Sequence, residues 1–391
     1  MLKTPLFSSL FLILILSHQV LVAQCINGLQ INGKPCPNPI STAVPFLRII
    51  PDARSGAMGD VGIALTPDAN SILYNASNLA TADRKWGASV NYSPWFLNFG
   101  FKDIFLLHEA GYFQFGQKSK QAVGLGVQYF SLGNIEWTDF NTQKIDTSYA
   151  YEMAITGAYA RQLNENWALG FSTKYIHSDL GRRETAAEGY PIRVGRALAV
   201  DLSATYKKPI SISHIKTNLV LGATISNVGN KITYSRESSF LPANLGIGGS
   251  YEMIFNKNNR LLIALEFNKL LVPTPNPFDT LSNEIQSPSV LNGIIRSFTD
   301  APRGFREEMQ EINTSIGLEY WLFQHLALRA GYFHESDLKG GRQYLTIGGG
   351  LRYRKWGAHV SYLASQSSFI CGQNPLNHTW RFSLLVNGVS W

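Results

Sequence analysis

Charged residues are scarce in this sequence. Only 16% of its 391 residues are Asp, Glu, Lys or Arg, whereas about a quarter is usual in soluble domains. The formal net charge is +7, but the basic residues are spread over many segments and form no patch with interleaved aromatics. This distribution argues against a nucleic-acid partner. It is compatible with contacts to outer-membrane lipid or lipopolysaccharide headgroups.

Long apolar runs are also missing beyond the N-terminus. No later stretch approaches 18 consecutive apolar residues, so the sequence predicts no helical membrane span. At the start of the chain, Lys3 precedes a short apolar run over 10–16, and a cleavage point lies before Gln24. This pattern predicts a signal peptide over residues 1–23. The alternative, an anchor helix, would need a longer apolar core.

Cysteine is rare, with Cys25, Cys36 and Cys371 as the only three. No spacing of Cys and His suits zinc, so we predict neither a metal site nor a cofactor. In an oxidising compartment Cys25 and Cys36 can pair and close a small N-terminal loop, or both can stay reduced. We interpret Cys371 as a loop thiol. A lipoprotein start at Cys25 fits less well, because Gln24 is bulky where a small residue is required.

Aromatic residues and glycines, by contrast, are plentiful, with 12% Phe, Trp and Tyr and 34 Gly. From Trp86 onward the side chains alternate with a period of two, as β-strands require. One apolar face and one small or polar face is the arrangement of a strand between lipid and a polar lumen. In segment 166–178, one face carries Trp167, Leu169, Phe171, Thr173 and Tyr175, and the other carries Ala168, Gly170, Ser172 and Lys174.

About fourteen segments fit this pattern, an even number, as in single-chain bacterial outer-membrane barrels. A soluble β-sandwich also alternates, but it does not need Trp or Tyr near so many strand ends. We therefore predict an all-β fold, a transmembrane antiparallel β-barrel of about 14 strands over residues 86–391, in the outer membrane of a Gram-negative cell. The predicted strands are 86–98, 104–115, 121–131, 151–163, 166–178, 195–208, 216–228, 241–255, 259–272, 310–322, 325–334, 342–353, 356–366 and 377–388.

The connections between these segments alternate in length. Periplasmic turns of outer-membrane barrels are short and external loops are long, so the long set is predicted to face outward. The short connections are 164–166, 256–259, the step near Gln324 and the step at Arg354-Lys355. The long connections are 132–150, 179–194, 229–240, 273–309, 335–341 and 367–376.

Residues 24–85 precede the barrel and lack the period of two. They are rich in small residues and short polar caps, which suit tight turns and short helical pieces. We predict an N-terminal periplasmic or plug segment. A plug that folds into the lumen explains the apolar residues Met58, Ile63, Leu73 and Tyr74 better than a simple periplasmic tail does.

Charged residues on the inward strand faces are expected to pair, because buried charges need partners. Lys174 and Asp201 belong to this inward set. We predict a structural network between plug and lumen wall, and the alternative is a path for ions or substrate. The predicted network consists of Arg48, Asp52, Arg54 and Asp60 on the plug and Glu266, Glu319, Arg329, Arg352 and Arg381 on the wall.

The longest connection, 273–309, begins with Pro-Thr-Pro-Asn-Pro, and 302–310 is typical of a helical turn. A loop of this length is usually functional, and aromatic residues beside charges suit an interface. We predict contacts with a partner or cargo protein through this loop, and the alternative is a lid that packs on its own barrel mouth. The candidate contact residues are Phe298, Pro302, Phe305, Arg306 and Glu307.

Catalytic chemistry is not expected. His334, Glu335, Ser336 and Asp337 are adjacent in sequence, but neighbouring positions at a strand end point to opposite faces and cannot form a triad. A hydrogen-bonded cluster at the loop end is the better interpretation. We predict that the protein is not an enzyme.

Several long stretches resemble one family. These stretches are FLRIIPDARSGAMGD at 46–60, YFSLGNI at 129–135, FLPANL at 240–245, NKLLVPTP at 268–275, SFTDAPRGF at 297–305, EINTSIGLEYW at 311–321 and RAGYFHE at 329–335. Through them the chain resembles, over about 46–391, the PorV (LptO) family of outer-membrane barrels from the type IX secretion system of Bacteroidetes.

The resemblance implies a fourteen-stranded barrel related to long-chain fatty-acid transporters. It also implies a giant translocon barrel (SprA or Sov) as partner, and cargo proteins that carry a type IX C-terminal signal domain. The cargo would pass to a surface attachment complex that contains the sortase-like PorU together with PorQ and PorZ. Fold analogy alone leaves one alternative, an outer-membrane transporter of hydrophobic small molecules.

Overall fold

The computed structural model describes residues 25–26, 29–30, 35–116, 120–138, 143–181, 192–212, 215–235, 237–275, 288–365 and 377–388. The predicted signal peptide and Cys371 lie outside these residues. In the described segments, the model contains no helix with the length and apolar character needed to cross a membrane.

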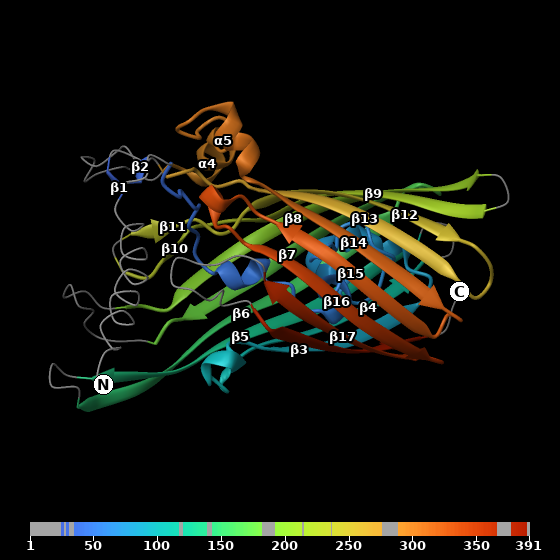
Figure 1. The fold of residues 1–391 in the computed structure, drawn as a ribbon, viewed down its shortest axis with the longest axis horizontal. Coiled ribbons are helices and arrows are strands. Elements are labelled where there is room, and N and C mark those ends of the chain that lie inside the picture. The colour runs from blue at the N-terminus through green and yellow to red at the C-terminus, as the bar shows by residue number, and fades with distance from the viewer. Residues whose placement is uncertain are drawn as a thin grey trace, which may run out of the picture.

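Fourteen strands in the described part of the chain close into one antiparallel barrel (Figure 1). The ring is completed by the pairing of β18 with β3 and of β9 with β12. Closure leaves no sheet edge with unpaired backbone groups in the membrane. The prediction of a fourteen-stranded barrel is therefore confirmed. The barrel strands are β3 (Trp86–Pro94), β4 (Ile104–Phe115), β5 (Gln121–Thr138), β6 (Lys144–Gln162), β7 (Trp167–Asp179), β8 (Gly195–Ile212), β9 (Ile215–Gly229), β12 (Asn244–Ile254), β13 (Arg260–Leu270), β14 (Ile312–Leu322), β15 (Leu326–His334), β16 (Gln343–Tyr353), β17 (Trp356–Ser365) and β18 (Thr379–Asn387).

The two faces of the barrel wall differ as the alternation predicts. On β7, Trp167 and Phe171 are 45% and 44% exposed, whereas the residues that follow them, Ala168 and Ser172, are at most 1% exposed. The strands β13 and β18 follow the same rule. The wall therefore presents apolar side chains outward and small or polar side chains to the lumen, as a lipid-embedded barrel requires.

The long connections gather at one end of the barrel and the short turns at the other (Figure 1). One prediction is wrong: 132–150 is not a long loop. There β5 continues to Thr138 and β6 begins at Lys144, so most of this range is a projecting hairpin. A β-bulge between Ser131 and Gly133 marks where the hairpin departs from the wall.

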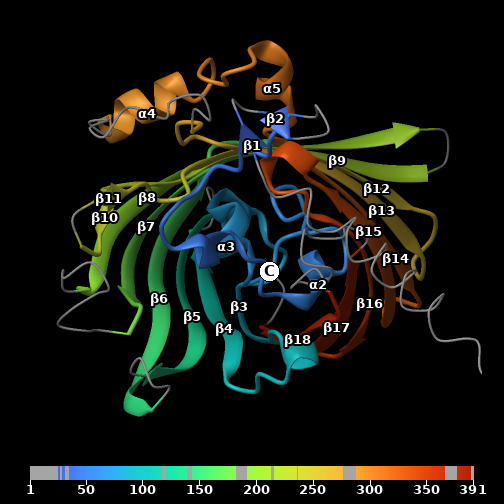
Figure 2. The ribbon, with the colours of Figure 1, turned by 60° about the vertical axis from the view of Figure 1, so that its left-hand side comes forward.

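Residues 45–85 fold inside the ring of strands (Figure 2). Four short elements make up this plug: η2 (Pro45–Arg48), α2 (Ala53–Gly56), α3 (Ser71–Tyr74) and η3 (Ala76–Thr81). Asp52 begins α2 by accepting the backbone N–H of Ser55 at 3.0 Å, which satisfies one of the free donors at a helix start. The protein core lies between the plug and the inner wall. Its largest clusters contain Phe46, Trp95, Leu106, Phe130 and Ile176, and, separately, Ile72, Leu79, Tyr112 and Ala122.

The chain reaches the plug from the end with the long connections. The backbone N–H of Asn38 donates to Leu338 in the connection between β15 and β16, and that of Ala43 donates to Phe240. Residues 35–44 therefore lie at the mouth with the long connections, and the division of the chain at 24–85 stays a prediction. The hairpin β1 (Cys25–Ile26) and β2 (Leu29–Gln30) precedes them.

Cys36, at the start of this mouth segment, is disulfide-bonded. Its predicted partner, Cys25, has a side chain outside the described part, so that pairing stays a prediction. The remaining small elements belong to the mouth and its loops: η4 (Leu97–Phe99), β10 (Ile232–Thr233), β11 (Ser238–Ser239), α4 (Val290–Arg296), α5 (Phe305–Gln310) and η5 (Asp337–Lys339).

Candidate functional site

A buried ion triad joins the plug to the barrel wall. Arg54 of α2 donates to both carboxylate oxygens of Glu319 on β14, at 2.9 and 2.8 Å. Arg329 on β15 donates to the same carboxylate at 2.7 Å. Glu319 is 1% exposed, so two guanidinium groups share one carboxylate away from water. Asp68, which the sequence interpretation missed, forms a third contact with Arg54 at 3.4 Å.

Two further carboxylates tie the plug to the wall. Asp60 accepts the hydroxyl of Tyr344 at 2.5 Å and faces Arg381 on β18 at 3.3 Å. Glu266 on β13 accepts the backbone N–H groups of Gly62 and Ile63, at 2.8 and 2.9 Å. The plug is therefore held by wall side chains from β13, β16 and β18.

Other residues of the predicted network take different places. Asp52 caps α2 and accepts the hydroxyl of Tyr74 at 2.8 Å, so it stays within the plug. The guanidinium of Arg352 lies over the ring of Trp321 at 4.3 Å. Lys174 pairs with Asp201 on the neighbouring strand at 2.8 Å, which is a contact within the wall. Arg48 faces a cavity between the plug and the long-loop end of the barrel.

Glycines let the plug backbone lie directly on the wall. A Cβ on Gly331 of β15 would stand 2.0 Å from the backbone nitrogen of Gly59, and a Cβ on Gly317 would stand 2.6 Å from the carbonyl oxygen of Met58. Gly59 itself has a φ of +69°, a conformation that favours glycine. The fit between the plug and β14–β15 therefore depends on missing side chains at these positions.

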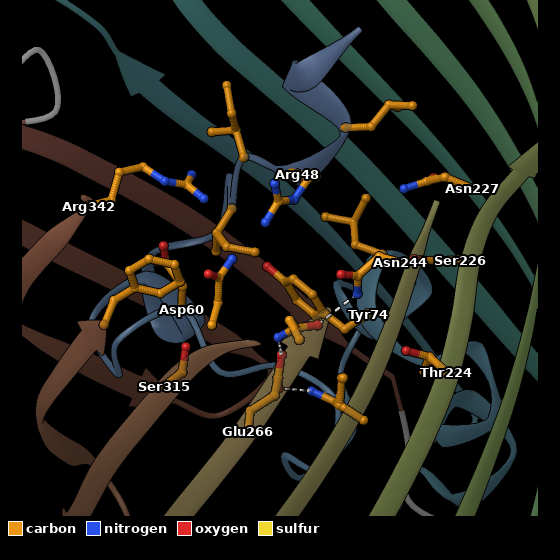
Figure 3. A pocket seen from close by; sticks show the side chains of 18 of the residues that line it. Arg48, Asp60, Tyr74, Thr224, Ser226, Asn227, Asn244, Glu266, Ser315 and Arg342 are labelled. Atoms are coloured by element: carbon orange, nitrogen blue, oxygen red, sulfur yellow. Dashed lines mark hydrogen bonds between the residues drawn. The ribbon is translucent and has the colours of Figure 1, made fainter. Parts of the chain in front are cut away.

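The lumen keeps a polar cavity of about 110 Å³ between the top of the plug and the long-loop end of the barrel. This volume is well below the roughly 300–1,000 Å³ of pockets that hold drug-sized ligands. Its lining includes Arg48, Asn227, Asn244, Glu266 and Arg342 (Figure 3). Within the described residues, the lumen therefore offers a small polar space in place of a continuous apolar channel.

The connection between β13 and β14 exposes apolar side chains beside the barrel mouth, where α4 and α5 lie (Figures 1 and 2). Phe298 and Phe305, both predicted contact residues, are 47% and 78% exposed. Arg306 is also exposed and Pro302 is half-buried. We call this set the α4–α5 surface. It consists of Leu291, Ile295, Phe298, Phe305, Arg306 and Met309.

Glu307 does not belong to the exposed set, which corrects the prediction for this residue. Its side chain is buried and accepts Lys339 Nζ at 2.6 Å and the Asn38 amide at 3.2 Å. Burial alone would raise the pKa of Glu307, but the hydrogen bonds from Lys339 and from the backbone of Arg303 hold the pKa below its usual value. Glu307 therefore anchors the loop and is not available to a partner.

A cluster of ion pairs around Glu307 fixes the position of α5. Glu311 accepts Lys339 at 2.9 Å and Lys269 at 2.5 Å, and Glu308 accepts Lys269 at 3.0 Å. The two lysines come from the β15–β16 connection and from β13. Because these contacts hold α5 beside the rim, the α4–α5 surface is presented in one orientation.

The residues considered for catalysis are occupied in other ways. Glu335 forms a two-point ion pair with Arg342, with both distances at 2.8 Å. Asp337 accepts the side-chain amide of Gln343 at 2.9 Å. The ring of His334 stacks on Tyr332 with centroids 6.4 Å apart. These contacts match the loop-end cluster expected from the sequence.

An antiparallel barrel with an apolar outer wall, a plugged lumen and long connections at one end defines an outer-membrane β-barrel protein. The family model for "Type IX secretion system protein PorV" matches residues 34–277. The chain therefore belongs to the PorV family. Its sequence matches no curated protein.

Several solved outer-membrane proteins have a similar chain path. The toluene transporter TbuX of Ralstonia pickettii shares 11% identity over 88% of this chain and 99% of its own, with a TM-score of 0.49. The toluene transporter TodX of P. putida shares 12% identity over 87% and 99%, with a TM-score of 0.48. A FadL homologue from Pseudomonas aeruginosa shares 10% identity over 90% and 99%, with a TM-score of 0.42.

Proposed function

We propose that this outer-membrane protein is the carrier barrel of a type IX secretion system. It binds the giant translocon barrel (SprA or Sov) and receives cargo through the C-terminal signal domain of each exported protein. It then delivers the cargo to the attachment complex of PorU, PorQ and PorZ. The observation that carries this proposal is the match of the PorV family model to residues 34–277.

The structure supports a role at the surface of the barrel. The plug is joined to the wall by buried ion pairs and by close backbone contacts, so the described lumen leaves no passage for a folded protein. The α4–α5 surface, in contrast, exposes apolar side chains next to Arg306. Exposed aromatic residues beside an arginine are typical of protein contact sites.

The alternative function, transport of hydrophobic small molecules, needs an apolar pocket under the external loops. The cavity found there has a volume of about 110 Å³, and arginine, asparagine and glutamate side chains share its lining with apolar residues such as Leu47 and Phe333. A hydrocarbon in this cavity would displace water from the polar side chains and offer them no hydrogen bonds in return, which is unfavourable. The carrier role is therefore the better supported of the two.

Co-purification tests the carrier proposal directly. The tagged protein would be extracted from outer membranes in a mild detergent, and the proteins bound to it identified by mass spectrometry. We expect a very large barrel together with proteins that share one C-terminal domain. Recovery of the barrel alone, with bound fatty acid or hydrocarbon, would contradict the carrier role and favour the transporter.

A single substitution tests the α4–α5 surface. Replacing Phe305 with Ser should reduce recovery of partner proteins about tenfold, because central aromatic contacts contribute about 1–3 kcal/mol or more to an interface. Phe305 is 78% exposed, so the substitution should leave the barrel's thermal stability unchanged. Quantitative mass spectrometry of the co-purified proteins is the measurement.

Tyr149 supplies the matched control. It is 73% exposed on the projecting β5–β6 hairpin. This hairpin lies away from α4 and α5 (Figure 2). Tyr149→Ser should leave partner recovery at the wild-type level. Equal recovery with Phe305→Ser and wild type would exclude the α4–α5 surface as the contact site, while leaving the carrier role to the co-purification result.

A further inference from the structure

The polar cavity above the plug gathers positive charge that the plug–wall network does not use. Arg48 of η2 and Arg342, which precedes β16, both line it (Figure 3). The other lining residues are six apolar side chains, the charged Asp60, Lys174 and Glu266, and nine side chains with amides or hydroxyls, among them Thr224, Ser226 and Ser315. Such groups donate hydrogen bonds, so the cavity is rich in donors for a compact ligand.

Arg48 is the distinctive member of this lining. Among the described residues it has no hydrogen bond and no ion pair, and its side chain is half-buried at the cavity. Burial lowers the pKa of Arg48 to about 10, and the charge of Arg342 lowers it as well, while the carboxylate of Glu335 acts in the opposite direction. The group therefore remains charged at neutral pH, in a place where its charge is poorly solvated. A half-buried cation without an ion pair gains from an anionic partner.

The remaining charges at the cavity are already paired. Arg342 donates to Glu335 through its Nε and Nη2 atoms. The Nη1 atom of Arg342 is left for another partner. Glu266 accepts the plug backbone and the amide of Asn268. Asp60 is bound by Tyr344 and Arg381. Lys174, which also lines the cavity, is paired with Asp201. Arg48 and the free edge of Arg342 are thus the groups that can bind an anion.

We propose that this cavity binds a phosphate group, held by the guanidinium groups of Arg48 and Arg342. Guanidinium forks match phosphate oxygens in pairs, and the surrounding hydroxyls and amides can serve the other oxygens. The volume of about 110 Å³ accommodates a small polyatomic ion. Because the cavity lies at the long-loop end, the phosphate arrives from outside the cell, either as a free ion or carried on a sugar.

Calorimetric titration of the detergent-purified full-length protein tests this site. Inorganic phosphate and glucose 6-phosphate would be titrated at neutral pH and low chloride, with glucose and acetate as comparison probes. We expect saturable binding of one or both phosphates. Tighter binding of glucose 6-phosphate identifies a sugar-borne phosphate, whereas tighter binding of inorganic phosphate identifies the free ion. Absence of saturable phosphate binding, or equal binding of acetate or glucose, would overturn the proposal.

Variants locate the binding to this cavity. Arg48→Gln should weaken phosphate binding about tenfold or more, because it removes a charge-assisted contact. Arg306→Gln removes the same charge from the exposed α4–α5 surface and should bind as the wild type does. Arg48→Lys, which keeps the charge and loses the planar fork, should fall between wild type and Arg48→Gln. Unchanged affinity in both Arg48 variants would place the phosphate elsewhere and overturn the proposal.

Discussion

Replacing Glu319 with Gln is expected to destabilise the folded barrel by about 3–5 kcal/mol. The substitution keeps the shape of the side chain and removes the one carboxylate that Arg54 and Arg329 share, at 2.8 and 2.7 Å. Because the side chain of Glu319 is only 2% exposed, water cannot replace the lost charge. Two guanidinium groups would then face each other at the wall of the lumen, and the plug would lose its strongest contact with β14.

Heat-modifiable mobility on SDS gels and the midpoint of urea unfolding measure this effect. In Glu319→Gln, the folded band should disappear at a lower temperature than in the wild type. The midpoint of unfolding should lie at a lower urea concentration. Glu136→Gln is the matched control, since Glu136 pairs with Lys144 at 2.7 Å but both side chains are more than half exposed. Surface pairs contribute about 0–1 kcal/mol, so this control should be unchanged. Equal stability of the two variants would exclude a structural role for the triad.

The barrel could be predicted from the sequence because two environments act on every strand. Lipid selects apolar side chains such as Trp167 and Phe171, while the lumen selects small or polar ones such as Ala168 and Ser172. Their alternation reveals both the strand and its orientation. The β5–β6 hairpin was missed because it projects beyond the wall. No lipid selects an apolar face there, and a run such as Lys144-Ile-Asp-Thr-Ser has the composition of a loop.

The candidate site could be predicted only in part. Charged residues at positions that were expected to be buried predict a network between plug and wall. Six of its members do meet inside the lumen, namely Arg54, Asp60, Glu266, Glu319, Arg329 and Arg381. The pairing itself depends on how the plug sits in the barrel, which no local pattern encodes. Glu307 illustrates the limit. A glutamate beside Arg306 in a long loop was expected to be exposed, but Lys339, 32 residues later, draws it inward.

The sequence also does not predict from which mouth of the barrel the N-terminal segment enters the lumen. Small residues and short caps predict a plug, and Met58 and Ile63 are indeed at most 3% exposed. Nothing in that composition states at which mouth the chain begins. The answer lies in long-range contacts such as Asn38 with Leu338 and with Glu307. Sequence patterns report the environment of each residue but not the partner that creates it.

Adding a single methyl group at Gly331 should displace the plug from the barrel wall. In Gly331→Ala the new Cβ would stand 2.0 Å from the backbone nitrogen of Gly59 and 2.1 Å from the carbonyl carbon of Met58. Backbone atoms cannot rotate away as a flexible side chain would, so the plug must shift or the barrel must deform, at a cost of about 1–3 kcal/mol or more. We expect a lumen that conducts ions where the wild type is closed.

Conductance of the purified protein in planar bilayers is the measurement, and heat-modifiable mobility verifies that the barrel has folded. Gly349→Ala provides the control, because Gly349 lies on the next strand, opposite Leu328, and its nearest neighbour would be the Ala327 carbonyl at 3.6 Å, an ordinary contact. That variant should stay closed. If folded Gly331→Ala is as closed as Gly349→Ala, the direct contact between Gly59 and Gly331 does not seat the plug, and the ion pairs of Arg54 and Asp60 hold it without this contact.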